Sequence, residues 1–143
     1  QIDNPTNVGA IMRSAQAFGF HGVVLDSETS DPFTRRALRV SMGTSFDASI
    51  CRVAQLAPVL DEFHTNGFTS CALTPARDAH NMAELAPIEK LILILGSERE
   101  GLEAGVMNAA TMRVRIPMAE GIDSLNVAAA AAVACYGLTS RSG

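Results

Sequence analysis

The chain has 143 residues, and its 48% of hydrophobic residues are enough for one domain with a substantial core. Asp and Glu (15) outnumber Lys and Arg (11), and the net charge of −4 excludes a basic coat over the whole surface, although not a local basic patch. No apolar stretch approaches the ~20 residues of a transmembrane helix, and the absence of a long polar tract argues against wholesale disorder.

The first half of the chain alternates helical periods with short apolar runs. Val8, Met12 and Ala15 recur at helical spacing, and Gly19 ends that helix. Asp31-Pro32 predicts a second helix start, because Asp can cap free amides and Pro fits the first turn. The remaining elements expected here are strands over 22–25 and 50–53 and a helix over 58–66, closed by Gly67.

The second half of the chain continues this alternation. We expect strands over 69–73, 90–95 and 112–116, a short helix over 103–110, and a last helix that Ser124 caps and that runs to about Leu138. The segment 90–95 is apolar almost throughout, which is typical of a strand buried on both faces in a parallel sheet. The sequence therefore predicts a three-layer α/β domain.

The cysteines and histidines show no spacing that suggests a metal or disulfide site. There is no C-x-x-C pair, so we interpret Cys51, Cys71 and Cys135 as buried, reduced thiols of a cytoplasmic protein. The histidines at positions 21, 64 and 80 are scattered, and no metal is expected.

Several common α/β sites lack their signatures. Gly96 and Gly101 have the spacing of a phosphate loop, but Leu102 stands where its lysine belongs. No G-x-G-x-x-G follows the first predicted strand, and no G-x-S-x-G nucleophile turn occurs.

Three segments carry polar residues where a turn or strand leads into a helix. The first, over 3–15, contains Asn7 and Arg13, which taken alone fit a helix cap and a solvated face. The second is the strand and loop over 91–102, where Gly96 fits either a plain turn or the close approach of a ligand to the backbone. In the third, over 115–128, Ser124 fits a cap and Asn126 the first helical turn.

Together, in order and spacing, the three segments resemble the motifs of the SpoU (TrmH-like) branch of the SPOUT RNA methyltransferases. The first motif, N-x-G-x-x-x-R, is Asn7, Gly9 and Arg13; the second is Gly96, Glu98, Gly101 and Leu102; the third is Ile116-Pro117-Met118 followed by Ser124-Leu125-Asn126-Val127. The segment 39–43 is similar to an intervening segment of that family, and the resemblance covers essentially the whole chain.

The resemblance implies a single catalytic domain over residues 1–143, with a three-layer parallel-sheet SPOUT fold and a deep C-terminal trefoil knot. It also implies S-adenosylmethionine as cofactor, bound through Gly96, Ile116 and Leu125. The catalytic positions that it carries over are Arg13, Asn7, Glu98, Ser124 and Asn126. An arginine there more easily stabilises a developing alkoxide or holds a phosphate than acts as a base, because its pKa exceeds about 12. For Glu98 and Asn126 a purely structural role remains an alternative.

The same resemblance implies methylation of a ribose 2′-hydroxyl in tRNA or rRNA, a homodimer, and an N-terminal RNA-binding extension absent from this chain. Three arginines on one predicted helix, Arg35, Arg36 and Arg39, fit either a phosphate-binding patch or a solvated face. Two alternatives are a non-catalytic knotted module that binds RNA or cofactor, and an ordinary flavodoxin-like domain. The second does not explain the third motif.

Overall fold

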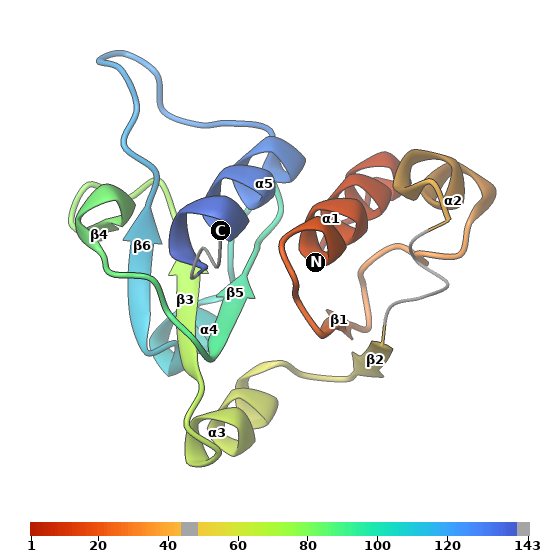
Figure 1. The fold of residues 1–143 in the computed structure, drawn as a ribbon, viewed down its shortest axis with the longest axis horizontal. Helices are drawn as coiled ribbons and strands as arrows, with labels where there is room; N and C mark the ends of the chain where they lie inside the picture. The colour runs from red at the N-terminus through yellow and green to blue at the C-terminus, as the bar shows by residue number, and fades with distance from the viewer. Residues whose placement is uncertain (44–48, 140–143) are drawn as a thin grey trace. The chain divides into compact units, whose positions relative to one another are not determined.

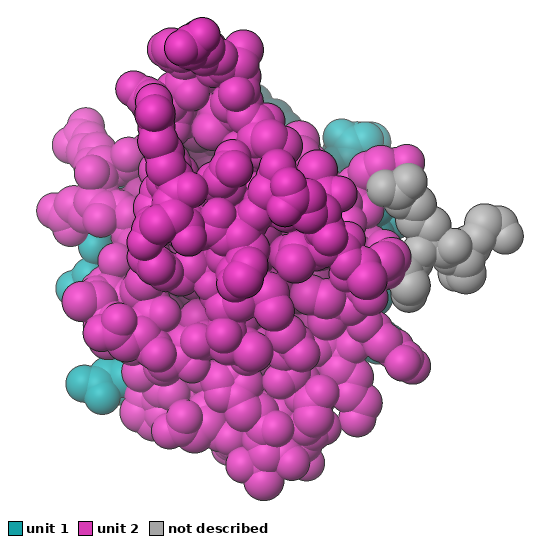
Figure 2. All heavy atoms as spheres, turned by 90° about the vertical axis from the view of Figure 1, so that its left-hand side faces the viewer, with its two compact units in different colours: residues 1–56 teal, residues 57–143 magenta. Residues whose placement is uncertain are grey.

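The computed structural model describes residues 1–43 and 49–139. The chain divides into two compact units, which Figure 2 shows in different colours. Unit 1 is Gln1–Leu56 and unit 2 is Ala57–Gly143. Each unit has its own parallel strands, so the predicted α/β class with parallel sheets is confirmed.

Unit 1 contains two helices and a pair of parallel strands (Figure 1). Its elements are α1 (Pro5–Ala17), β1 (Gly22–Asp26), α2 (Arg35–Ser41) and β2 (Ser49–Val53). The register of the strands pairs Gly22 with Ser49 and Asp26 with Val53. Among the described residues β1 and β2 hydrogen-bond only to each other, so they form a sheet separate from that of unit 2. The sequence pattern did not predict two separate sheets.

The first helix begins and ends as its sequence dictates. The Asn4 side chain accepts a hydrogen bond from the Thr6 amide, and Pro5 occupies the first turn, so Asn4 rather than Asn7 is the cap. At the other end Gly19 has a φ of 79°, which a glycine adopts without strain. The amides of Gly19 and Phe20 then reach back to carbonyls of the last turn, and the predicted end at Gly19 is confirmed.

The predicted start of the second helix at Asp31-Pro32 is wrong. The Asp31 side chain accepts from the Phe33 amide and forms a turn, and α2 begins at Arg35 with Thr34 as its cap. The Thr34 hydroxyl accepts from the Ala37 amide at 3.2 Å. A short polar side chain can accept a hydrogen bond from a backbone amide two or three positions later, both in a turn and at the start of a helix. The sequence pattern alone therefore does not show whether Asp31 caps a helix or forms a turn before one.

Helices α1 and α2 pack closely because two small residues meet. A Cβ atom added to Gly9 would lie 2.4 Å from the carbonyl oxygen of Ala37. Ala37 itself has no exposed surface. The glycine of the first motif is therefore explained by helix packing within unit 1.

Unit 2 is built on a four-stranded parallel sheet in the order β4-β6-β3-β5. In chain order its elements are α3 (Ala57–Thr65), β3 (Thr69–Leu73), β4 (His80–Asn81), the 3₁₀ turn η2 (Met82–Glu84), β5 (Leu91–Ile94), α4 (Ala104–Ala109), β6 (Met112–Arg115) and α5 (Val127–Leu138). The order shows that the chain passes from β5 across β3 to reach β6. The predicted strands and helices of this half are all present, with ends shifted by at most three residues, whereas β4 and the 3₁₀ turn were not predicted.

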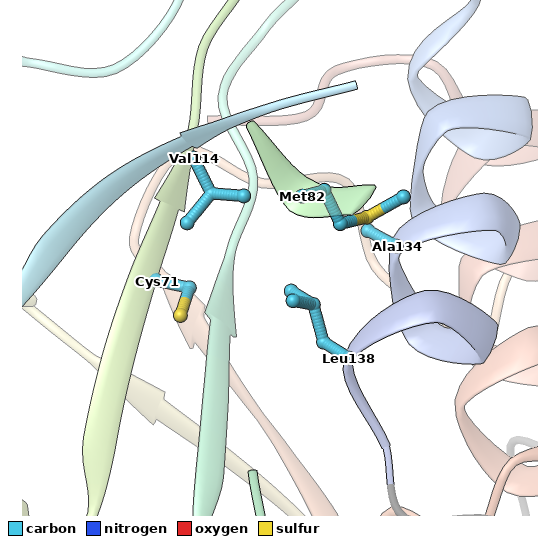
Figure 3. Packing of buried hydrophobic residues seen from close by; sticks show 5 residues of the cluster. All are labelled: Cys71, Met82, Val114, Ala134 and Leu138. Carbon is cyan, nitrogen blue, oxygen red and sulfur yellow. The ribbon is translucent and has the colours of Figure 1, made fainter. Parts of the chain in front are cut away.

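The sheet of unit 2 is covered on both faces. On one face Cys71 and Val114 pack against Ala134 and Leu138 of α5, with Met82 closing the cluster (Figure 3). On the other, the hydroxyl of Ser70 lies 2.7 Å from Nε2 of His64 in α3. Successive strand residues point to opposite faces, so Ser70 and Cys71 mark the two sides, and unit 2 has three layers.

Two burial expectations are corrected by this arrangement. The apolar segment 90–95 forms the edge strand β5 of the unit 2 sheet, and only Ile94 of β5 is buried, whereas β3 lies between β5 and β6. Of the cysteines, Cys71 and Cys135 are buried but Cys51 is exposed on β2. No helix within the described residues is long and apolar enough to cross a membrane.

Candidate functional site

The second and third motifs follow the carboxyl ends of two strands of the unit 2 sheet. β5 ends at Ile94 and leads into the loop from Gly96 to Leu102, and β6 ends at Arg115 and leads into the loop from Ile116 to Asn126. Because both strands run parallel to β3, their carboxyl ends lie at the same edge of the sheet. Ligands of open α/β sheets bind at this edge.

The loop after β5 folds back so that the backbone of Gly101 and Leu102 lies against Gly96. The Gly101 amide donates to the Ser97 carbonyl at 3.0 Å, and Gly101 has a φ of 69°. A Cβ atom on Gly96 would lie 2.4 Å from the carbonyl carbon of Gly101 and 2.6 Å from the Leu102 amide nitrogen. The space beside Gly96 is thus filled by the loop itself, which explains why a side chain is excluded there.

Glu98 joins the second motif to the third. Its Oε1 accepts hydrogen bonds from Nδ2 of Asn126 at 2.7 Å and from the Val127 amide at 3.1 Å. Oδ1 of Asn126 in turn accepts from the amides of Ala128 and Ala129. A carboxylate and an amide side chain thereby satisfy the first three amides of α5, and the negative charge lies at the positive end of the helix.

The cap of α5 is Asn126, so the prediction that Ser124 caps this helix is wrong. Ser124 and Leu125 are exposed in the loop before it, with 40% of Leu125 accessible. Ile116, directly after β6, is half-buried against the hydrophobic core of unit 2. Asn126 captures the amides because it adjoins the first helical residue, whereas Ser124 lies three residues before Val127.

The first motif lies on α1 in unit 1. Asn7 is 8% exposed and Arg13 is exposed, so the two residues occupy different faces of the helix. The structure therefore brings Glu98 and Asn126 into contact and places Gly96, Ile116 and Leu125 in loops at one edge of unit 2. Asn7 and Arg13 belong to unit 1.

One side chain at the edge of the unit 2 sheet was not singled out by the motifs. Nε of Arg115, the last residue of β6, is buried and has no hydrogen-bond partner in the part of the chain that the structure describes. In the sequence Arg113 and Arg115 alternate with Met112, Val114 and Ile116, a pattern typical of a strand with one solvent-facing side. The position of Arg115 directly before the Ile-Pro-Met motif was the available signal.

A separate hollow of about 360 Å³ lies towards the start of β6. Asp78, His80 and Thr111 are among its lining residues. The guanidinium of Arg113, hydrogen-bonded to Asp78 at 2.7 Å, holds the pKa of that carboxyl group below its usual value. Within residues 1–43 and 49–139, no three His, Cys, Asp or Glu side chains gather as a metal site would require.

Comparison with known proteins identifies relatives over the full length of the chain. A protein of Mycobacterium tuberculosis (strain H37Rv) named an uncharacterised tRNA/rRNA methyltransferase is 39% identical over 145 residues, covering 99% of this chain and 50% of that protein. The AdoMet-bound structure of an rRNA methyltransferase from Sinorhizobium meliloti has a TM-score of 0.84 at 28% identity, covering 96% of this chain and 52% of that one. A structure described as an RNA 2′-O ribose methyltransferase has a TM-score of 0.82 at 32% identity, covering 96% and 52%.

The chain spans about half the length of these relatives. A model of the SpoU rRNA methylase family matches residues 1–136, which include all three motifs. The resemblance of those motifs is thus supported by a match over almost the whole chain, and this chain belongs to the SpoU rRNA methylase family.

Proposed function

We propose that this chain is the catalytic domain of an RNA methyltransferase that transfers a methyl group from S-adenosylmethionine to a ribose 2′-hydroxyl of tRNA or rRNA. The observation that carries the proposal is the 2.7 Å hydrogen bond between Glu98 and Asn126, which joins the second and third motifs at the carboxyl edge of the sheet. The names of the relatives, one of them a 2′-O ribose methyltransferase, support the same reaction.

The loops at this edge suit the cofactor. Leu125 and Ile122 expose apolar surface in the loop that begins at half-buried Ile116, and apolar side chains together with backbone groups can recognise an adenine ring. The proposal includes the family's C-terminal trefoil knot, in which the segments around Gly96, Ile116 and Leu125 form the cofactor pocket. When bound, S-adenosylmethionine supplies an electrophilic methyl group on a sulfonium.

Arg13 is the residue that we assign to the acceptor. In the reaction the S–CH₃ bond breaks, an O–CH₃ bond forms and the 2′-hydroxyl loses its proton. A guanidinium remains protonated throughout, so Arg13 stabilises the developing alkoxide or holds the adjacent phosphate, and the proton leaves to solvent. Asn7 and Ser124 are proposed to position the nucleotide, and Glu98 and Asn126 hold the loop and helix that frame the pocket.

The test of Arg13 is methyl transfer to RNA from a strain lacking the gene. We expect Arg13→Gln to lower kcat by about 10² to 10³, the cost of losing one charge-stabilising donor, while leaving the affinity for S-adenosylmethionine unchanged. Arg77→Gln is the matched control, since Arg77 is also an exposed arginine. Full activity of the Arg13 variant would remove this residue from the mechanism.

The non-catalytic module remains the second candidate. It would bind S-adenosylmethionine and RNA without methylating any cellular RNA, even as the full-length protein. Mapping the labelled nucleotide in the same assay distinguishes the two candidates and identifies the RNA. A product methylated on a base would contradict the assignment to the ribose.

The proposal also includes a homodimer. Ala129, Val133 and Tyr136 recur at helical spacing on α5 and are exposed, with 41% of Val133 and 50% of Tyr136 accessible. An apolar stripe of this kind is typical of a helix that packs against a partner. Val133→Glu is expected to shift the mass measured by light scattering towards the monomer.

A further inference from the structure

Helix α2 presents three arginines on one exposed face. Arg35, Arg36 and Arg39 are exposed, and Arg39 lies four positions after Arg35 and three after Arg36, the spacings that place side chains next to each other on a helix. Ala37 and Ser41, on the buried side of the same helix, have no exposed surface. We call the exposed set the arginine face of α2; its orientation within unit 1 is fixed by the close packing of α2 on α1.

Among the residues that the structure describes, the positive charge of this face has no acidic partner. No carboxylate in the described ranges 1–43 and 49–139 forms an ion pair with these three side chains. The sequence has no Asp or Glu between Pro32 and Gly43. Residues 1–56 carry five arginines and five acidic residues, so the whole net charge of −4 comes from residues 57–143.

The placement of these arginines works against the stability of their own helix. Arg35 and Arg36 occupy the first turn of α2, beside the positive end of the helix dipole, where a cation is unfavourable. Arg39 repels both of them across one turn. Residue choices that weaken their own local structure are expected at sites that serve a partner, and the partner here must be an anion.

We infer that the arginine face of α2 binds the phosphodiester backbone of the RNA substrate. This inference rests on the proposed function. Guanidinium groups form paired hydrogen bonds with phosphate oxygens, and backbone contacts of this kind set the position of a nucleic acid without reading its sequence. Phe33, two residues before the helix, is 46% exposed and adds an aromatic surface on which an unpaired base can stack.

The test is the salt dependence of RNA binding by the full-length protein. Labelled bulk tRNA and bulk rRNA from a strain lacking the gene are titrated between 50 and 200 mM KCl. Each lost phosphate contact lowers the slope of log K against log salt by roughly 0.7 to 0.9. The triple variant R35Q/R36Q/R39Q should therefore lower the slope by about 2 to 3, so wild type loses about 20 to 40 times more affinity over this range than the variant.

Three further variants separate electrostatics from misfolding. R35K/R36K/R39K keeps the charge and should retain most of the slope, and R36Q should lower the slope by about 1. R77Q removes an exposed arginine from unit 2 and should leave the slope unchanged. Binding of S-adenosylmethionine, measured by calorimetry, should be the same in all of them.

A wild-type slope in the triple glutamine variant overturns the inference, and so does an equal effect of R36Q and R77Q. If the triple glutamine variant does not fold, the lysine and single variants decide the question. If the wild type transfers methyl groups but the glutamine variants keep the wild-type salt slope, only the assignment of RNA binding to the arginine face is rejected. Failure of the wild type to methylate or bind either RNA rejects the proposed function itself.

Discussion

Gly96→Ala tests whether the loop after β5 needs glycine for its own fold or only for a ligand. The added Cβ would lie 2.4 Å from the Gly101 carbonyl carbon, 2.6 Å from the Gly101 oxygen and 2.6 Å from the Leu102 nitrogen. These are backbone atoms, which cannot swing aside as a side-chain end does. The loop must shift, and overpacking of this kind costs about 1 to 3 kcal/mol.

For a chain of this length that cost corresponds to a fall in Tm of about 3 to 10 °C. Gly105→Ala is the matched control, because Gly105 lies in α4 and a Cβ there meets nothing within 4 Å. Alanine favours a helix over glycine by up to about 1 kcal/mol, so this variant should be unchanged or slightly more stable.

The assay is urea or thermal unfolding without cofactor, followed by calorimetric titration with S-adenosylmethionine. We expect Gly96→Ala to be destabilised before any ligand is added and to bind the cofactor more weakly. Wild-type stability with lost cofactor affinity would refute the packing argument, because the glycine would then serve only the approach of the ligand. Wild-type values in both measurements would contradict the loop geometry itself.

The remaining predictions concern the start of α5 and the thiols. Asn126→Ala should destabilise the chain by about 0.5 to 2 kcal/mol, the usual cost of losing a side-chain cap. In urea unfolding of E98Q, N126A and the double variant, the effects should not add, since the two side chains share a hydrogen bond; strict additivity would contradict the coupling. In the native protein a thiol reagent at pH 8 should modify exposed Cys51 and spare Cys71 and Cys135; rapid labelling of all three would contradict their burial. Burial raises the pKa of Cys71 and of Cys135 to about 11 from an ordinary value of 9.0. The native thiols therefore keep protons that the unfolded chain releases, and the free energy of unfolding should fall as the pH rises from about 9 to 11. Equal urea midpoints at pH 8 and pH 10 would show that this linkage is absent.

Local chemistry was the part of the fold that the sequence predicted well. The end of α1 at Gly19 and the span of β3 follow from a glycine able to adopt positive φ and from an apolar run of strand length. Two of the predicted helix starts were wrong. Asp31 and Ser124 have the side chain of a cap, but Thr34 and Asn126 perform that role because they adjoin the first helical residue.

The motifs of the candidate site could also be predicted from the sequence, but the contacts between them could not. Its motifs were visible in the chain because each lies within a short segment, and the family match over residues 1–136 supports them. The hydrogen bond from Asn126 to Glu98 was not predictable, since the two residues are 28 positions apart. The same applies to the buried Nε of Arg115, because burial of an atom depends on what the rest of the chain places over it.

By itself, then, the sequence determined the class of fold, the family, and the order of the strands and helices apart from β4 and the 3₁₀ turn η2. These depend on hydrophobic period, capping residues and motifs that act over a few positions. Only the tertiary structure decided which strands pair, that β3 rather than β5 lies inside the unit 2 sheet, and that the glycines at positions 9 and 96 are required by neighbouring backbone. Those outcomes depend on contacts between residues distant in the chain, and a single sequence does not encode such distances in any local pattern.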